Sequence, residues 1–86
     1  LCQEGHRALK YTKYFQAIRN RPDRSIIKDE WIRHVMESPE REYIQADGRV
    51  RRWARIDEYD GRYLRVVFLP DNVTVHNAFF DRGYKP

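Results

Sequence analysis

The chain has 86 residues, which suffices for one domain but not for two domains that each bury a core. Hydrophobic residues make up 41% of it and aromatic residues 14%, as in globular proteins, while a formal net charge of +4 favours polyanionic partners. The single cysteine, Cys2, excludes an internal disulfide and is typical of a reducing cytosol. No apolar run approaches the roughly 18 residues of a membrane span, and no signal-peptide pattern opens the chain. We therefore expect a cytoplasmic protein without a membrane partner. Because the chain begins with Leu1 rather than methionine, we expect an initiator or a longer N-terminus before it.

Residues 1–10 show no clear period and predict a flexible N-terminal arm, followed by a single domain over residues 11–86. From Tyr11 to Asn20, apolar side chains recur at helical spacing, and Thr12 is suited to cap the start of a helix. Pro22 ends this helix, because a proline disfavours helical geometry at the residue before it.

A second helix is predicted from Lys28 to Glu37. Ile27, Trp31 and Val35 form one apolar stripe along it. Two acidic residues fall in its first turn, where the helix dipole favours negative charge. Pro39 closes the segment.

After this proline the pattern changes to that of strands, which we place at residues 41–46, 49–58, 62–69 and 73–80. The dipeptide Asp47-Gly48 is typical of a tight hairpin turn. The expected fold is α+β, with two N-terminal helices packed on one face of a four-stranded antiparallel meander sheet, in the order ααββββ.

The register of the second and third strands decides what the other face of the sheet carries. A three-residue turn at residues 59–61 predicts four pairs: Ile56 with Leu64, Ala54 with Val66, Trp53 with Val67, and Arg55 with Arg65. A two-residue turn would place Ile56 against Arg65 and would mix apolar with charged side chains. If the next turn is at residues 71 and 72, Val75 lies opposite Phe68 and His76 lies beside Val67; other loop lengths would turn the last strand over.

The predicted open face therefore gathers basic and aromatic residues: Arg49, Arg51, Trp53, Arg55, Tyr63, Arg65 and His76, with Arg82, Tyr84 and Lys85 at its lower edge. Arginines pair with phosphates through parallel hydrogen bonds, and flat aromatic rings stack on unpaired bases. The expected opposition of Arg55 and Arg65 is unfavourable without an anion between them. Two other interpretations stay open: a solvated face whose arginines pair with neighbouring acids such as Asp57, or a surface for an acidic protein.

The candidate chemistry at this face is the cleavage of RNA without a metal. The 2′-hydroxyl of RNA can attack its own phosphate, so the protein needs only proton-transferring groups and cations around the developing charge. His76 can transfer a proton near neutral pH, although a lone histidine on a strand is more often structural. The three histidines are far apart in the sequence and lack ligand spacing, and no glycine-rich phosphate loop occurs, so no metal or cofactor is expected.

Two stretches, "ESPEREYIQADGRVRRWARI" and "RYLRVVFLPDNVTVHNAFFDR", resemble the small RelE/BrnT-like toxins of bacterial toxin–antitoxin systems. The likeness covers residues 12–85. It consists of a helix ending at a proline, an arginine-rich strand, the segment "LRVV", and a strand that closes with an aromatic residue and an arginine. The first helix carries no histidine and the strands carry few lysines, whereas both occur in many relatives of this type. The two helices before the sheet are nearer to the BrnT branch.

This resemblance implies a metal-independent endoribonuclease of a type II system that inhibits translation, often on messenger RNA at the ribosome, with a cognate antitoxin covering the active face. The implied catalytic residues are Arg55, Arg65, His76, Arg82 and Tyr84, and the RNA-binding residues are Arg49, Arg51, Trp53, Tyr63 and Lys85. The alternative is a non-catalytic module that docks RNA or a protein on the same basic-aromatic face.

Overall fold

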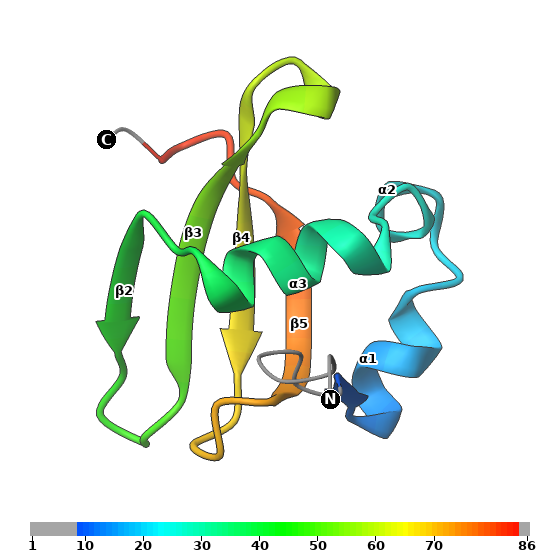
Figure 1. Ribbon diagram of the computed structural model, residues 1–86. Coiled ribbons are helices and arrows are strands. Elements are labelled where there is room, and N and C mark those ends of the chain that lie inside the picture. Colours follow the sequence, from blue (N-terminus) through cyan, green and yellow to red (C-terminus); the bar gives the residue numbers. More distant parts are fainter. Residues whose placement is uncertain (1–8, 85–86) are drawn as a thin grey trace, which may run out of the picture.

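The computed structural model describes residues 9–84, apart from the side chain of Asp23, as a mixed α+β domain. Figure 1 shows a twisted sheet with helices crossing one of its faces. Its elements in chain order are β1 (Lys10–Tyr11), α1 (Lys13–Ile18), α2 (Pro22–Ser25), α3 (Asp29–Glu37), β2 (Arg41–Ile44), β3 (Val50–Ile56), the 3-10 turn η1 (Asp57–Tyr59), β4 (Arg62–Phe68) and β5 (Thr74–Phe80).

The sheet has five strands in the order β1-β5-β4-β3-β2, so the predicted four-stranded antiparallel meander is wrong. The additional strand, β1, pairs in parallel with β5, which places Lys10 beside Thr74 and Tyr11 beside Val75. The remaining neighbours pair antiparallel. A strand of two residues is too short to show the alternation by which strands are recognised. These two residues also lie where the predicted arm meets the predicted helix.

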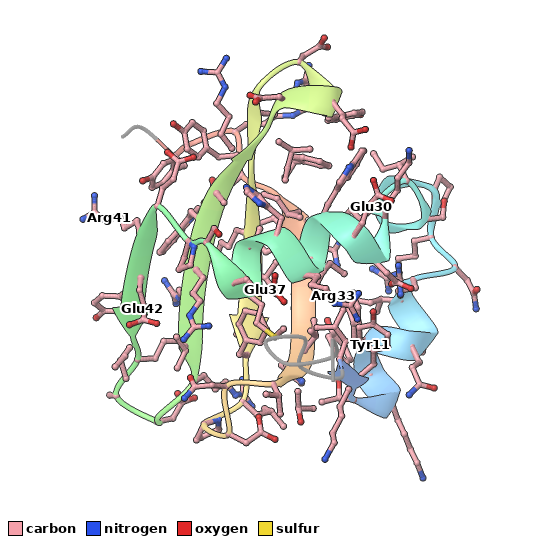
Figure 2. The ribbon with its side chains drawn as sticks, in the orientation of Figure 1. Tyr11, Glu30, Arg33, Glu37, Arg41 and Glu42 are labelled. Atoms are coloured by element: carbon pink, nitrogen blue, oxygen red, sulfur yellow. The ribbon has the colours of Figure 1, made fainter. Side chains whose placement is uncertain are left out.

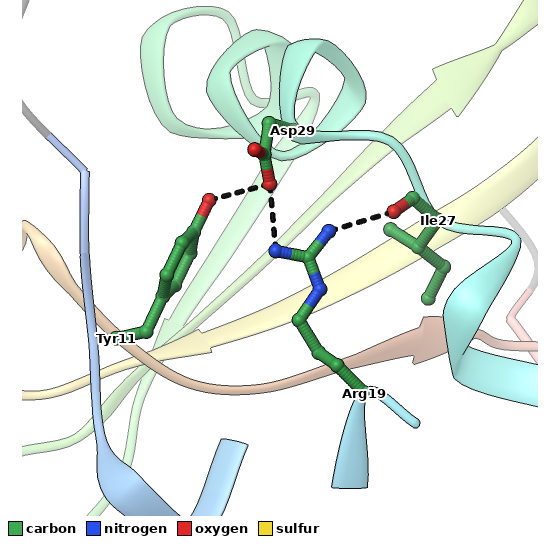
Figure 3. A network of polar contacts seen from close by, with 4 residues as sticks. All are labelled: Tyr11, Arg19, Ile27 and Asp29. Carbon is green, nitrogen blue, oxygen red and sulfur yellow. Dashed lines mark hydrogen bonds and ion pairs between the residues drawn. The ribbon is translucent and has the colours of Figure 1, made fainter. Parts of the chain in front are cut away.

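A polar network fastens β1 to the helices (Figure 3). The Tyr11 hydroxyl donates to Asp29 Oδ1 at 2.6 Å, and Arg19 Nη1 donates to the same oxygen at 2.7 Å. Arg19 Nη2 donates to the carbonyl oxygen of Ile27 at 2.9 Å. Burial and the hydrogen bond to the Asp29 carboxylate raise the pKa of Tyr11 to about 12. The network thus joins β1 with the end of α1 and the start of α3.

The three helices follow from local signals. The Thr12 side chain caps α1 by accepting from the backbone N–H of Phe15 at 3.1 Å. Pro22 was expected only to end a helix, but it also begins α2, where its missing N–H has no intrahelical partner to lose. α3 buries Trp31 and Val35 as the apolar stripe predicts. It lies against β3 and β4, whereas α1 and α2 contact β5.

The pairing of β3 with β4 differs from the expected register by two residues. Arg55 lies opposite Tyr63, and Trp53 lies opposite Arg65, so the predicted opposition of Arg55 and Arg65 is wrong. The cause is the connection, which spans residues 57–61: η1 is followed by Asp60 and Gly61 in the left-handed conformation, at φ 58° and 66°. Because the shift is even, each side chain stays on the expected face of the sheet.

The pairing of β4 with β5 contains an irregularity. Val75 lies opposite Phe68, as expected, but the next pair joins Val67 with Asn77. His76 is the additional residue between these pairs, so its predicted place beside Val67 is wrong. The core lies between the sheet and the helices, and its fully buried side chains include Phe15, Ile32, Leu64, Val66, Phe68 and Val75.

Candidate functional site

The sheet face that points away from α3 is the candidate site, and we call it the open face. It carries Arg51, Trp53 and Arg55 of β3, Tyr63, Arg65 and Val67 of β4, and Asn77 and Phe79 of β5. Side chains of a strand alternate between the faces. The intervening residues, such as Ala54, Leu64 and Ala78, are fully buried in the core. After β5 the chain turns back across the ends of β4 and β3 (Figure 1).

Trp53 is the centre of the open face, but its ring is covered rather than exposed. Only 8% of the residue is accessible to solvent. The Tyr84 ring stacks on it with 5.4 Å between centroids, and the Tyr84 ring also contacts Tyr63 at 4.7 Å. Trp53 Nε1 donates to Asp81 Oδ2 at 3.0 Å. The returning segment after β5 therefore supplies both the cover and the polar partner of this tryptophan.

Arg65 is a largely enclosed cation of the open face, with 22% of its side chain accessible to solvent. Its guanidinium lies 5.6 Å from the Trp53 ring and 5.1 Å from the Phe79 ring, and its Nη1 lies 3.6 Å from Asp81 Oδ2. Burial and the nearby positive charge of Arg51 lower the pKa of Arg65, whereas Asp81 raises it. The group stays charged, because an arginine is not deprotonated in proteins. Its Nε is buried without a hydrogen-bond partner, so this donor is unused.

Arg51 lies on the same face, one strand over. Its Nε donates to Gln45 Oε1 at 3.0 Å, and its guanidinium lies 5.7 Å from the Tyr43 ring. Arg51, Tyr43 and Tyr84 line a hollow of about 590 Å³ that we call the arginine hollow. Arg41 of the outer strand β2 also lines it and projects from the edge of the sheet in Figure 2. Two acidic residues, Glu42 and Asp81, complete the charged lining of this hollow, and Arg65 lies next to it behind Trp53 and Asp81.

The other predicted phosphate-binding arginines have acidic partners. Arg55 Nε lies 3.0 Å from Asp57 Oδ1, and Arg49 Nε lies 3.6 Å from Asp47 Oδ2. Exposed pairs of this kind contribute about 0–1 kcal/mol to stability, so they can exchange for a phosphate. The Tyr63 hydroxyl donates to Glu40 at 3.3 Å, and desolvation and this carboxylate raise the pKa of Tyr63.

His76 lies at the other end of β5 from Arg82 and Tyr84. Its Nδ1 is 3.3 Å from the Thr12 hydroxyl, and its ring stacks on Tyr14 with 5.1 Å between centroids. Burial, and then the charge of Arg49, lower the pKa of His76, which favours the neutral ring. Phe80 lies four positions further along the strand, a span of about 13 Å. The structure thus brings Arg51, Arg65 and Tyr84 together on the open face. It does not bring His76 near Arg82 or Tyr84. Lys85 lies outside the described residues.

Two residues that were given no role in the sequence are central here. Asp81 accepts from Trp53 and pairs with Arg65, and its position directly after a strand was the available signal. Arg24 of α2 reaches the open face, where Nη1 donates to Asn77 Oδ1 at 2.8 Å and the guanidinium lies 5.4 Å from the Phe79 ring. No local signal could reveal that contact, because 53 positions separate Arg24 from Asn77.

A second concave region lies where β5 ends. Two adjoining hollows of about 440 and 280 Å³ share Arg62, Phe80 and Arg82, and we call them together the terminal hollow. Tyr63, Asp81 and Tyr84 complete the lining of the first, while Arg24, Ile26, Tyr59 and Phe79 complete that of the second. Arg82 therefore faces a different space from the one beside Arg51.

Comparisons of the chain with protein-family models, with curated proteins and with solved structures found no match. Within residues 9–84, no helix is long and apolar enough to cross a bilayer. Over the same part of the chain, no three histidine, cysteine, aspartate or glutamate side chains gather as metal ligands would.

Proposed function

We propose that the open face binds RNA and that the protein cleaves it without a metal, as a toxin of the RelE/BrnT type that inhibits translation. One observation supports this most: Arg51 and Arg65 lie on neighbouring strands of the open face, and the charge of Arg51, after burial, lowers the pKa of Arg65 although Asp81 lies 3.6 Å from it. Such a pair is unfavourable alone and becomes favourable when a phosphate lies between the two guanidinium groups.

The chemistry follows from RNA itself. The 2′-oxygen attacks the adjacent phosphorus and loses its proton to water, the bond to the 5′-oxygen breaks, and the products are a 2′,3′-cyclic phosphate and a 5′-hydroxyl. Arg51 and Arg65 stabilise the charge that grows on the phosphoryl oxygens. We assign the proton that the departing 5′-oxygen needs to the hydroxyl of Tyr84, which lines the arginine hollow. Arg49 and Arg55 bind flanking phosphates.

The wider features of this assignment are proposals as well. A cognate antitoxin would cover the open face, messenger RNA on the ribosome would be the target, and the site of action would be the cytoplasm. The net charge of +4 supports a polyanionic target and an acidic partner surface.

A non-catalytic RNA-binding module is the second candidate. It is favoured by the position of His76, which the bulge and the length of β5 keep away from Tyr84 and Arg82. In that case the same arginines hold RNA, and no group at the arginine hollow transfers a proton.

The test is a cleavage assay with purified protein and a structured messenger RNA in excess EDTA, with binding measured in parallel. Arg65→Gln and Arg51→Gln remove one charge each, and Arg21→Gln is the control, because Arg21 is an exposed arginine at the start of α2. One charge-assisted contact is worth about 1.5–3 kcal/mol, so each site variant is expected to lose roughly 10- to 150-fold in cleavage. Binding without cleavage would support the second candidate, and neither binding nor cleavage would overturn both.

A further inference from the structure

The terminal hollow is lined by two exposed arginines, Arg62 and Arg82. Within residues 9–84, neither Arg62 nor Arg82 forms an ion pair, and both side chains are exposed. Arg62 lies over the Tyr59 ring at 5.6 Å, which orients its guanidinium at the rim. Two positive charges therefore flank the same space.

The walls between these cations are aromatic. Tyr59 and Phe80 stack with 4.5 Å between centroids, and Trp31 supports Phe80 edge-on at 5.9 Å from behind. One carboxylate, Asp81, lines the hollow. Its two oxygens already accept from Trp53 Nε1 and from the backbone N–H of Gly83, each at 3.0 Å. The hollow thus offers cations and aromatic rings to a ligand, while the Asp81 carboxylate is already hydrogen-bonded to Trp53 and Gly83.

We propose that the terminal hollow binds one nucleotide, with its phosphate between Arg62 and Arg82 and its base against the aromatic wall. Guanidinium groups bind phosphates bidentately, and aromatic rings and guanidinium planes accept unstacked bases. The two volumes, about 440 and 280 Å³, lie near the roughly 300–1,000 Å³ of small-molecule sites. That the natural ligand is part of an RNA chain rests on the proposed function.

Continuity with the arginine hollow supports a nucleotide that belongs to the same RNA strand. Tyr84 and Asp81 line both the terminal hollow and the arginine hollow. A strand whose phosphate lies at Arg51 and Arg65 therefore reaches the terminal hollow by passing across Tyr84. The terminal hollow then contacts the neighbouring nucleotide and contributes to the choice of sequence.

The experiment titrates isotopically labelled protein with adenosine 3′-monophosphate, and separately with a DNA hexanucleotide, which lacks the 2′-nucleophile and is not cleaved. Arginine Nε–Hε and aromatic signals are followed by NMR. We expect the largest shifts at Arg62, Arg82 and Phe80 with both ligands. Arg62→Gln and Arg82→Gln are each expected to weaken mononucleotide binding about tenfold or more, whereas Arg21→Gln, with the same charge change, leaves it within twofold.

Three outcomes would overturn the site: no shifts at millimolar mononucleotide, shifts centred on Arg51 and Tyr43 instead, or an equal loss of affinity in Arg21→Gln. Shifts in the wild-type protein decide the question even if a variant unfolds. If the mononucleotide binds more tightly than the hexanucleotide, the hollow binds a free nucleotide. That result would overturn the proposed path of one RNA strand through both hollows. Because no cleavage is measured, failure of the ribonuclease proposal leaves this result unchanged.

Discussion

At the scale of single residues, Tyr84 has two parts in the proposed mechanism. Its ring covers Trp53, and its hydroxyl is the proposed proton donor. Tyr84→Phe keeps the stack and removes the hydroxyl. We expect RNA affinity within about twofold of wild type and cleavage slower by roughly 10²- to 10⁴-fold, the usual contribution of general acid catalysis. Single-turnover cleavage and equilibrium binding measure the two effects separately.

Two controls define that prediction. Tyr14→Phe removes a hydroxyl from an exposed tyrosine beside His76 and is expected to change neither quantity. Tyr84→Ala removes the stack as well and should expose Trp53, which shifts its fluorescence emission to longer wavelength. Cleavage by Tyr84→Phe at the wild-type rate would show that another group, or water, protonates the leaving oxygen.

The sequence pattern predicted which residues of β3 and β4 share the open face, but it did not predict those of β5 or the side chains that cover the face. Alternation along a strand depends only on local geometry, so Trp53 and Arg65 could be placed on one side from their positions. The cover comes from Tyr84 and Asp81, which return after β5, and from Arg24, which belongs to a helix far away in the sequence. Such contacts depend on tertiary packing, which a period of two cannot show.

At the scale of elements, the register errors come from one connection and from one bulge inside a strand. The β3–β4 register was wrong by two residues because η1 lengthens the connection, and a turn type is weakly encoded when several loop lengths preserve the same alternation. The bulge at His76 adds one residue without a glycine or proline to mark it. The longer elements were predictable, because the apolar stripe of α3 and the strand alternation repeat several times.

The hydrogen bond between Tyr11 of β1 and Asp29 is expected to contribute to the stability of the fold. Tyr11→Phe removes the 2.6 Å hydrogen bond to Asp29 and is expected to lower the free energy of unfolding by about 1 kcal/mol at neutral pH, since the pair is exposed. Because the folded pKa is raised from 10.0 to about 12, the wild-type contribution is complete below pH 10 and is lost as pH rises through 12. Urea unfolding at pH 8 and pH 11 measures the loss of unfolding free energy in Tyr11→Phe and its dependence on pH.

Tyr11→Phe has no hydroxyl to ionise at position 11, so its free energy of unfolding should lack the fall that Tyr11 causes in the wild-type protein at alkaline pH. The difference in unfolding free energy between the two proteins should therefore narrow at high pH. Tyr43→Phe is the matched control, because the Tyr43 side chain is exposed on the outer strand. A difference that stays constant from pH 8 to pH 11 would mean that the ionisation of Tyr11 is not coupled to folding and that β1 is held by its backbone pairs with β5.

At the scale of the whole molecule, bulk charge and site geometry make different predictions in a cell. A net charge of +4 attracts nucleic acid at any surface, whereas the proposed activity needs Arg51 and Arg65 side by side. Induced expression of the wild-type protein in a bacterial host is expected to arrest growth. The double variant Arg51→Gln/Arg65→Gln should relieve the arrest. The double variant Lys13→Gln/Arg21→Gln loses the same charge at two exposed positions of the helices and should retain most of it.

Growth curves, immunoblots for protein level and the integrity of cellular messenger RNA together decide this comparison. Arrest that persists in Arg51→Gln/Arg65→Gln at equal protein level would place the harmful activity outside the open face. Relief in both double variants would mean that total charge, rather than the arrangement of the arginines, causes the effect. Arrest without shortened messenger RNA would favour the binding module, since RNA held on the open face can block translation without being cut.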